Sequence, residues 1–341
     1  MFKRILVPLD GSVLAEQTFP LVAHLARATE GSVILQHVIS PPREAYRSLP
    51  EAALQSMIEI NRVEGRTYLE KVASAEVFSH VPTQCQIAIG SAASSILSCA
   101  QAQHVDLIVL SRHGYSGSTR WNLGGVAEKV VHEAGIPILL LPNRETPSPD
   151  TASHDKHAYH VLVPLDGSPL AEAAILPAAH LATALSDPGQ GTVRLTQVVR
   201  PTSRASQHDG QKETVFEVEH YLHTVTERLY RSLGPYLKIA TIWSLLAGMD
   251  VAATLLEEVE ATGSTNNEEL SGSVEALAMT THGWGGIQYH MIGSIAERVL
   301  RATTLPLLLI PSREPSPLAK NILIRHKTAH EIPFWADFFY C

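Results

Sequence analysis

The chain has 341 residues, of which 45% are hydrophobic and 18% charged, and its formal net charge is -8 at pH 7. This composition is typical of a soluble globular protein and argues against disorder, and the negative charge disfavours nucleic acid or an anionic membrane as a partner. The length alone predicts about two domains of roughly 150 residues each.

The sequence also indicates a cellular compartment. Cys85, Cys99 and Cys341 have neither metal-binding nor disulfide spacing, which suits a reducing environment. The amino-terminal segment MFKRILVPLDG enters an apolar strand at once and has none of the features of an export signal. Every uninterrupted apolar stretch is well short of the roughly 20 residues that a membrane-spanning helix needs. We therefore expect a cytoplasmic protein with no membrane span.

Short apolar runs alternate with longer amphipathic stretches along the chain, which predicts strand-helix-strand units and a parallel sheet. The first set of predicted strands is Arg4–Pro8, Ser32–Ile39, Cys85–Ile89, Leu107–Ser111 and Ile136–Pro142, and its helices are Val13–Ala28, Pro50–Ala75, Ala93–Gln103 and Gly125–Ala134. The second set of strands is His160–Pro164, Thr192–Val199, Lys238–Leu245, Leu277–Thr281 and Leu305–Pro311, and its helices are Pro169–Leu185, Glu213–Leu233, Asp250–Ala261 and Gly293–Arg301.

These two sets are copies of one another. ILVPLDGSVL at 5–14 returns as VLVPLDGSPL at 161–170, and the runs IPILLLP and LPLLLIP close the two copies. Self-similarity over this length predicts a duplicated α/β domain, each copy Rossmann-like, with a five-stranded parallel sheet and helices on both faces. We expect a first domain at 1–143, a linker at 144–157, a second domain at 158–312 and a tail at 313–341.

The tail ends in a cluster of aromatic residues, which are Phe334, Trp335, Phe338, Phe339 and Tyr340. We expect an amphipathic extension that docks on the body of the protein. A segment that contacts a partner or a membrane surface is the alternative.

Ligands of open parallel sheets bind beyond the carboxyl ends of the strands. The motif PLDGS follows the first strand of both copies, at Pro8–Ser12 and at Pro164–Ser168. Asp and Ser in such a place cap the start of a helix. The alternative is that the carboxylates of Asp10 and Asp166 accept hydrogen bonds from a ligand.

The loop after the fourth strand carries a pair of glycines in each copy, separated by nine residues: Gly114 and Gly124, and Gly283 and Gly293. The second glycine opens the last helix, where unpaired N–H groups carry partial positive charge and glycine permits close approach. This arrangement suits a phosphate. Ser294 could add a hydroxyl donor in the second copy, whereas Gly125 has no side chain.

Other residues of this loop could have either a structural role or a role in binding a ligand. His113 and His282 precede the first glycine and either order the loop as neutral rings or contact a phosphate. Arg112 and Arg120 could supply positive charge, but the second copy has no cation in either place. We therefore expect both arginine side chains to be solvated.

These motifs resemble the universal stress protein family, and the resemblance covers both copies. Nucleotide-binding members of that family carry the pattern G-x2-G-x9-G-[S/T] in the fourth-strand loop. The pattern would map onto Ser111, Gly114, Gly124 and Gly125 in one copy and onto Thr280, Gly283, Gly293 and Ser294 in the other. Both copies depart from it at the first glycine, and the first copy departs again at its last position.

The resemblance implies an adenine nucleotide alpha hydrolase-like fold that binds ATP, with Mg²⁺ as a companion that the sequence leaves open. By resemblance, Asp10 and Asp166 would face the adenosine, main-chain groups near Val38 and Val198 would lie close to the base, and the glycine loops would hold the ribose and phosphates. Pro8 and Pro164 precede the two aspartates. The second copy is the better candidate site because it keeps Ser294.

The resemblance also implies that the two closing strands pair across a pseudo-twofold axis, so that one chain mimics the family's dimer; a further homodimer is an open possibility. The sequence has no GxxxxGK[ST] loop, no GxSxG elbow and no HExxH pair. We expect a regulatory, stress-responsive ATP-binding module. A nucleotide-independent interaction scaffold and a weak ATPase are the alternatives.

Overall fold

A computed structural model shows the fold of the protein. It describes residues 1–42, 47–114, 123–142, 158–186, 190–201, 208–234, 236–261, 273–282 and 292–312. The linker 144–157, most of the glycine loops and the aromatic tail lie outside these ranges.

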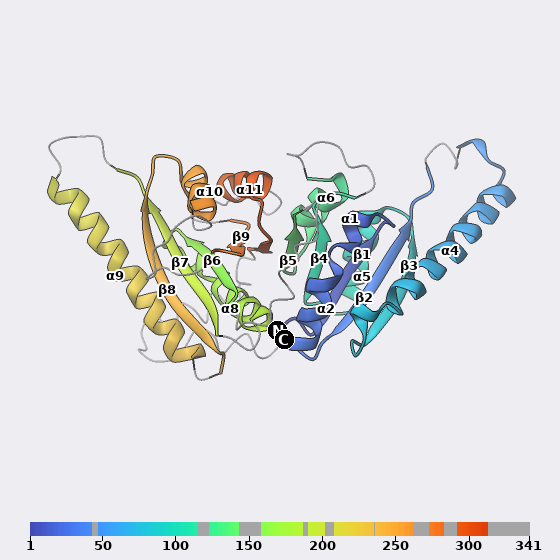
Figure 1. The fold of residues 1–341 in the computed structure, drawn as a ribbon. Helices are drawn as coiled ribbons and strands as arrows, with labels where there is room; N and C mark the ends of the chain where they lie inside the picture. The colour runs from blue at the N-terminus through green and yellow to red at the C-terminus, as the bar shows by residue number, and fades with distance from the viewer. Residues whose placement is uncertain are drawn as a thin grey trace, which may run out of the picture.

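Each half is an α/β layer in which helices follow strands (Figure 1). The first half contains β1 (Arg4–Leu9), α1 (Val13–Glu16), α2 (Phe19–Ala28), β2 (Ser32–Ile39), α4 (Glu51–Ala73), β3 (Thr83–Ile89), α5 (Ala92–Ala102), β4 (Leu107–Ser111), α6 (Gly125–Glu133) and β5 (Ile138–Leu141), with a short 3-10 turn at Glu76–Phe78. The second half contains β6 (His160–Leu165), α7 (Pro169–Glu172), α8 (Ile175–Leu185), β7 (Gly191–Val199), α9 (His208–Leu233), β8 (Ile239–Ala247), α10 (Val251–Ala261), β9 (Ala276–Thr280), α11 (Ser294–Ala302) and β10 (Leu307–Ile310).

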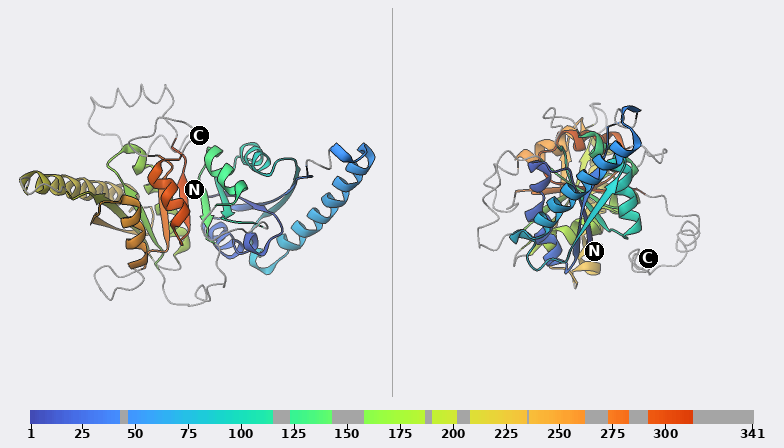
Figure 2. Two further views of the ribbon diagram at one scale, coloured as in Figure 1. Left: turned by 90° about the horizontal axis from the view of Figure 1, so that it is seen from above. Right: turned by 90° about the vertical axis from the view of Figure 1, so that its right-hand side faces the viewer.

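All ten strands form one sheet, in the order β3-β2-β1-β4-β5-β10-β9-β6-β7-β8. Neighbouring strands within each half are parallel, which confirms the predicted Rossmann-like class. Helices α1, α2, α4, α7, α8 and α9 cover one face and α5, α6, α10 and α11 cover the other, with a hydrophobic core under each layer. The long helices α4 and α9 lie at opposite ends of the molecule (Figure 2).

The two halves join at an antiparallel pair of apolar strands, β5 and β10. Leu140 lies opposite Leu307 and Leu139 opposite Leu308, and all four side chains are fully buried. Leu139 and Leu308 enter the core under α2 and α8, whereas Leu140 and Leu307 enter the other core. Both cores therefore run without interruption from one half into the other.

The long helix expected after each first strand is in fact two helices. In the first half α1 ends at Glu16 and α2 begins at Phe19, with Pro20 in its first turn. Proline has no N–H to donate to the carbonyl of residue i-4, here Glu16, and its ring clashes with that carbonyl in a continuous helix. The prediction of one helix over 13–28 was therefore wrong, and Pro177 has the same effect near the start of α8.

Helices α2 and α8 form a second contact between the halves. Both helices carry small residues that are almost fully buried, among them Ala23, Ala26 and Ala178. His24 Nε2 donates a hydrogen bond of 3.1 Å to the carbonyl oxygen of Ala184 across the boundary.

We predict that Leu139→Asp separates the halves or unfolds the protein. The change removes buried apolar volume and places a charge between two cores, which should cost more than about 4 kcal/mol. Urea unfolding measures the loss. Ile60→Asp, at an exposed position of α4, is the matched control, and an equal loss in both variants would contradict the role of the β5–β10 pair.

We also predict a pH dependence that originates at the α2–α8 contact. Burial lowers the pKa of His180 to about 4 from its ordinary value of 6.5. The unfolded chain therefore binds a proton more readily than the folded chain between these values, and stability that is present above pH 6.5 falls as the pH drops toward 4. The loss is on the order of 2 to 3 kcal/mol. Urea unfolding from pH 7 to pH 4 should show a shallower decline for His180→Gln, and parallel curves would contradict this assignment.

Candidate functional site

The turn after β1 holds its aspartate in a fixed position. Gly11 adopts a φ of +82°, which an L side chain rarely adopts, and the chain reverses there toward α1. The N–H of Ser12 donates to Asp10 Oδ1 at 3.0 Å, and the N–H of Ala15 donates to Ser12 Oγ at 3.2 Å. The expected helix cap is therefore present, and serine rather than aspartate provides it.

The turn after β6 repeats this geometry. Gly167 has the same φ of +82°, Ser168 N–H donates to Asp166 Oδ1 at 2.9 Å, and Ser168 Oγ accepts from Ala171 N–H at 3.1 Å. Both carboxylates thus lie at the carboxyl edge of the sheet, each held on one oxygen by its own backbone.

The fourth-strand loop of the first half lies directly against this aspartate. A Cβ atom added to Gly114 would be 1.9 Å from Asp10 Oδ2 and 3.0 Å from its carboxyl carbon. Only glycine fits there without moving the carboxylate. The structure therefore brings Asp10 and Gly114 together, as a shared site requires, whereas Gly283 lies outside the described residues.

The second glycine of each loop opens the last helix. Gly124 N–H donates to the carbonyl of Arg112 at 2.9 Å, and Gly293 N–H donates to that of Thr281 at 2.7 Å. The helices α6 and α11 begin at the next residues, Gly125 and Ser294. Because the first N–H groups of a helix have no partner within it, both loops present backbone donors at this edge.

The hydroxyl side chains that replace the family's first glycine have a structural function. Ser111 Oγ donates to the carbonyl oxygen of His113 at 2.9 Å, and Thr280 Oγ1 donates to that of His282 at 2.7 Å. Each hydroxyl thereby stabilises the first bend of its loop.

His282 is anchored in the second loop. Its N–H donates to Ser312 Oγ at 3.1 Å, and its Nδ1 lies 3.1 Å from Thr281 Oγ1. Burial lowers the pKa of His282 below its ordinary value, so the ring is neutral at pH 7. Its Nε2 is buried and has no hydrogen-bond partner among the residues that the structure describes. The ring therefore orders the loop on one side and has one nitrogen available on the other.

Arg112 is the residue for which the sequence prediction was wrong. We expected a solvated side chain, but Arg112 is only 9% exposed, and its Nε and Nη2 are buried with no hydrogen-bond partner in the described part of the chain. Burial lowers its pKa to about 10, so the guanidinium is still charged at pH 7. The first half therefore has a buried cation directly before its glycine loop. Arg120 lies outside the described residues.

A half-buried polar pair near each aspartate was missed from the sequence. Tyr68 on α4 donates to Glu16 on α1 at 2.9 Å, and Tyr221 on α9 donates to Glu172 on α7 at 3.1 Å. Burial, followed by the bond to the carboxylate, raises the pKa of each tyrosine. The sequence contained a signal for this pair, because a glutamate follows the loop aspartate by six residues in both copies (10 to 16 and 166 to 172).

The remaining predicted positions also lie at the carboxyl edge. Pro8 and Pro164 are in β1 and β6, two residues before the aspartates. The last pairings of these strands are Leu9 with His37 and Leu165 with Gln197, so Val38 and Val198 lie just past the ends of β1 and β6. Within the described ranges, no group of three or more His, Cys, Asp or Glu side chains could hold a metal ion, and no helix has the length and apolar character of a membrane span.

Comparison with known proteins gives one consistent result. The model of the universal stress protein family matches residues 1–142 and again residues 158–311. A universal stress protein of Thermus aquaticus is 32% identical over 145 residues, which is 41% of this chain and 99% of the relative. Another, from Mycolicibacterium smegmatis, is 22% identical over 324 residues and 91% of this chain, covering 97% of the relative.

A solved structure has the same fold over almost the whole chain. The universal stress protein of Archaeoglobus fulgidus matches with a TM-score of 0.62 at 16% identity, covering 92% of this chain and 100% of that one. At this identity the likeness concerns the fold alone.

The contact between Gly114 and Asp10 generates a prediction with an internal control. Gly114→Ala should lower the free energy of unfolding by about 1 to 3 kcal/mol, because the new methyl group displaces a carboxylate that is bonded to Ser12 N–H. A Cβ atom at position 125 would have no atom within 4 Å, so Gly125→Ala should leave the free energy of unfolding unchanged or raise it by up to about 1 kcal/mol. Thermal or urea unfolding compares the two, and equal effects would show that the close approach is unimportant.

Proposed function

We propose that this chain, which belongs to the universal stress protein family, binds an adenine nucleotide, ATP, at the carboxyl edge of its sheet and acts as a regulatory or stress-response module. The observation that carries the proposal is the contact between the Asp10 carboxylate and Gly114. It places a fixed acceptor beside a loop that leads to the start of a helix. A nucleotide requires both, an acceptor for its hydroxyl or amino groups and donors for its phosphates.

The phosphates would bind at the start of the last helix. The first amides of α11 point toward this edge, and Ser294 adds a hydroxyl at its first position. The partial positive charge of a helix start favours an anion by about 0.3 to 1 kcal/mol per charge in exposed settings. Mg²⁺ would be carried by the phosphates, since the described residues contain no metal-binding cluster.

The adenosine would lie at the carboxyl ends of the first two strands of a half. Asp166 is held with one oxygen on Ser168 N–H, so its position is fixed before a ligand arrives. Val198 lies beyond the end of β6 on the neighbouring strand. This arrangement supports a ribose or base contact for Asp166 and a main-chain contact for Val198, with Asp10 and Val38 in the same places in the first half.

The second half is the site we expect to fill first. Its loop keeps the hydroxyl of Ser294, whose counterpart Gly125 can donate only from the backbone. One neutral hydrogen bond is worth about 1 kcal/mol, nearly tenfold in affinity. In the first half, the buried Arg112 supplies a charge that the second half lacks, so the two sites should differ in affinity.

We also propose that the two halves are domains, at 1–143 and 158–312, which together act as the equivalent of a dimer within one chain. The antiparallel pairing of β5 with β10 supports this. A weak ATPase is the alternative, and Asp166 or the neutral ring of His282 would then have to act as the base. We favour regulation through occupancy over turnover.

Calorimetric titration with ATP and magnesium tests the proposal. The protein is first stripped of nucleotide, and Gly293→Val is compared with Gly124→Val, its counterpart in the first half. Side chains at the two positions would meet equivalent backbone atoms, at 3.3 Å from Thr281 O and 3.2 Å from Arg112 O. We expect binding near one site per chain, weakened at least tenfold by Gly293→Val and retained in Gly124→Val.

Two outcomes would contradict the proposal. The absence of heat at millimolar ATP, from a folded and nucleotide-free protein, would favour a nucleotide-independent interaction scaffold. Unchanged binding in both valine variants would place any nucleotide away from the helix starts.

A further inference from the structure

A cavity of about 730 Å³ lies between the two halves, at the edge of the sheet opposite the glycine loops. Helices α2 and α8 form part of its wall. The other lining residues lie in segments that precede strands, which are Met1 and Lys3 before β1, Thr29 and Glu30 before β2, Ser186 before β7 and Leu237 before β8. The amino terminus of the chain lies where α2 and α8 meet (Figure 1). The cavity is therefore separate from the proposed nucleotide sites.

The charges that line this cavity are mainly positive. Lys3 and Arg27 both line it, and Glu30 is the one acidic residue among the described residues that do so. Lys3 Nζ lies 3.8 Å from Glu30, whose side chain is 91% exposed. A pair of this kind contributes little in water, so Glu30 neutralises Lys3 only weakly.

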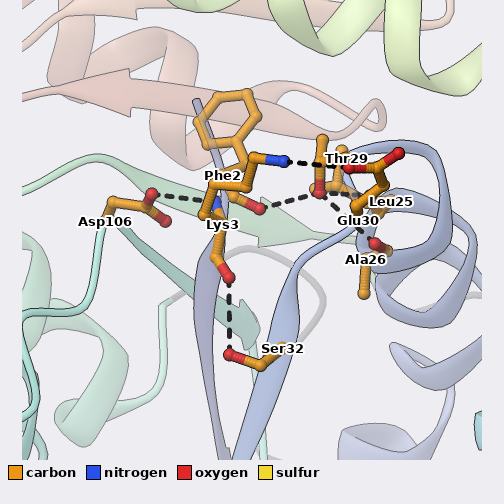
Figure 3. A network of polar contacts seen from close by, with 8 residues as sticks. All are labelled: Phe2, Lys3, Leu25, Ala26, Thr29, Glu30, Ser32 and Asp106. Atoms are coloured by element: carbon orange, nitrogen blue, oxygen red, sulfur yellow. Dashed lines mark hydrogen bonds and ion pairs between the residues drawn. The ribbon is translucent and has the colours of Figure 1, made fainter. Parts of the chain in front are cut away.

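Lys3 and Glu30 are carried by a fixed backbone (Figure 3). Asp106 accepts the N–H groups of Lys3 and Arg4 at 2.8 Å and 3.0 Å. Thr29 donates to the carbonyl of Phe2 at 2.9 Å, which ties the end of α2 to the start of β1. The backbone that carries Lys3 is thus held before any ligand binds, while the Lys3 side chain itself is 58% exposed.

Arg27 is also held in place. Its Nη1 donates to the carbonyl of Val77 at 2.9 Å, which leaves the other guanidinium nitrogens for a second partner. Arg27 also lines an adjoining cavity of about 480 Å³ with Glu76, Val77, Ser79 and His80. Arg27 therefore lines both cavities, the one of about 480 Å³ and the one of about 730 Å³.

Two histidines that occupy equivalent positions behave differently here. His24 and His180 both follow their loop aspartate by fourteen residues (10 to 24 and 166 to 180), and both line the cavity. His24 donates to the carbonyl of Ala184. The described contacts include no hydrogen bond for His180, although burial keeps its ring neutral at pH 7. His180 is thus a half-buried imidazole on the wall of the cavity that Lys3 and Arg27 also line, and the charged amino terminus at Met1 is the cation that acts on its pKa. Its ring N–H provides a donor for an anion.

We propose that this cavity binds a small tetrahedral dianion, such as the phosphate group of a small metabolite, with Lys3 and Arg27 as its cations and His180 as a hydrogen-bond donor. The site combines cations from the first half with an imidazole from the second. Occupancy would therefore add a bridge across the α2–α8 contact. The cavity is several times larger than one such anion, which leaves room for the rest of a phosphorylated molecule.

Sulfate is the suitable probe, because it stays dianionic from pH 4 to pH 8 and any pH dependence then comes from the protein. The full chain is titrated in chloride buffer while NMR follows the ring protons of His180, assigned with His180→Gln. We expect sulfate to raise the His180 midpoint by about one unit from its starting value near 4, which corresponds to about tenfold tighter binding to the protonated form.

Charge-matched variants locate the site. The pair Lys3→Gln and Arg27→Gln should weaken sulfate binding at least tenfold, whereas Arg66→Gln with Lys71→Gln, on the exposed surface of α4, should leave it nearly unchanged. The sulfate-induced shift of the His180 midpoint should persist in Gly293→Val. This variant therefore distinguishes failure of the anion site from failure of the nucleotide site. Tighter binding of glucose 6-phosphate than of sulfate would support a phosphate ester as the ligand.

Three results would overturn the proposal. They are an unmoved His180 midpoint at saturating sulfate, equal weakening by the two charge-matched pairs, and a shift that survives loss of both Lys3 and Arg27.

Discussion

The pairing of β5 with β10 is the interaction on which the rest of the structure depends. Without it the molecule would be two small sheets, each with an exposed apolar edge formed by leucines of the closing run. Exposed strands of that kind tend to pair with other chains. Here each edge covers the other within one chain, and Leu139 with Leu308, and Leu140 with Leu307, extend the two cores across the boundary. The α2–α8 contact and the cavity beside it lie between the same two halves that this pairing joins.

The joined sheet places two kinds of surface on opposite edges. The carboxyl edge has the features of a nucleotide site, with a carboxylate held by its own turn, a glycine that touches it, and helices that begin nearby. The amino edge has a cavity between the halves, lined by cations and by the imidazole of His180. Because the second surface includes residues of both halves, a ligand there would act on their association, whereas a nucleotide would act within one half.

Much of this could be predicted from the sequence, because duplication allowed each motif to be checked against its copy. The strands follow apolar runs and the Ser12 cap follows from residue type, both local properties. The break before α2 was missed although Pro20 indicates it, since proline is also common in a first helical turn. The burial of Arg112 and the contact of Gly114 with Asp10 depend on how distant segments fold together. No local pattern reports such contacts.

Hydrogen–deuterium exchange with and without ATP and magnesium tests whether a nucleotide binds where the loop aspartates meet the helix starts. We expect slower exchange in the segments 164–172 and 292–297, with smaller changes in 8–16 and 123–128 and none in the edge strand β8. Protection confined to other segments, or no protection at saturating ATP, would contradict binding at this edge.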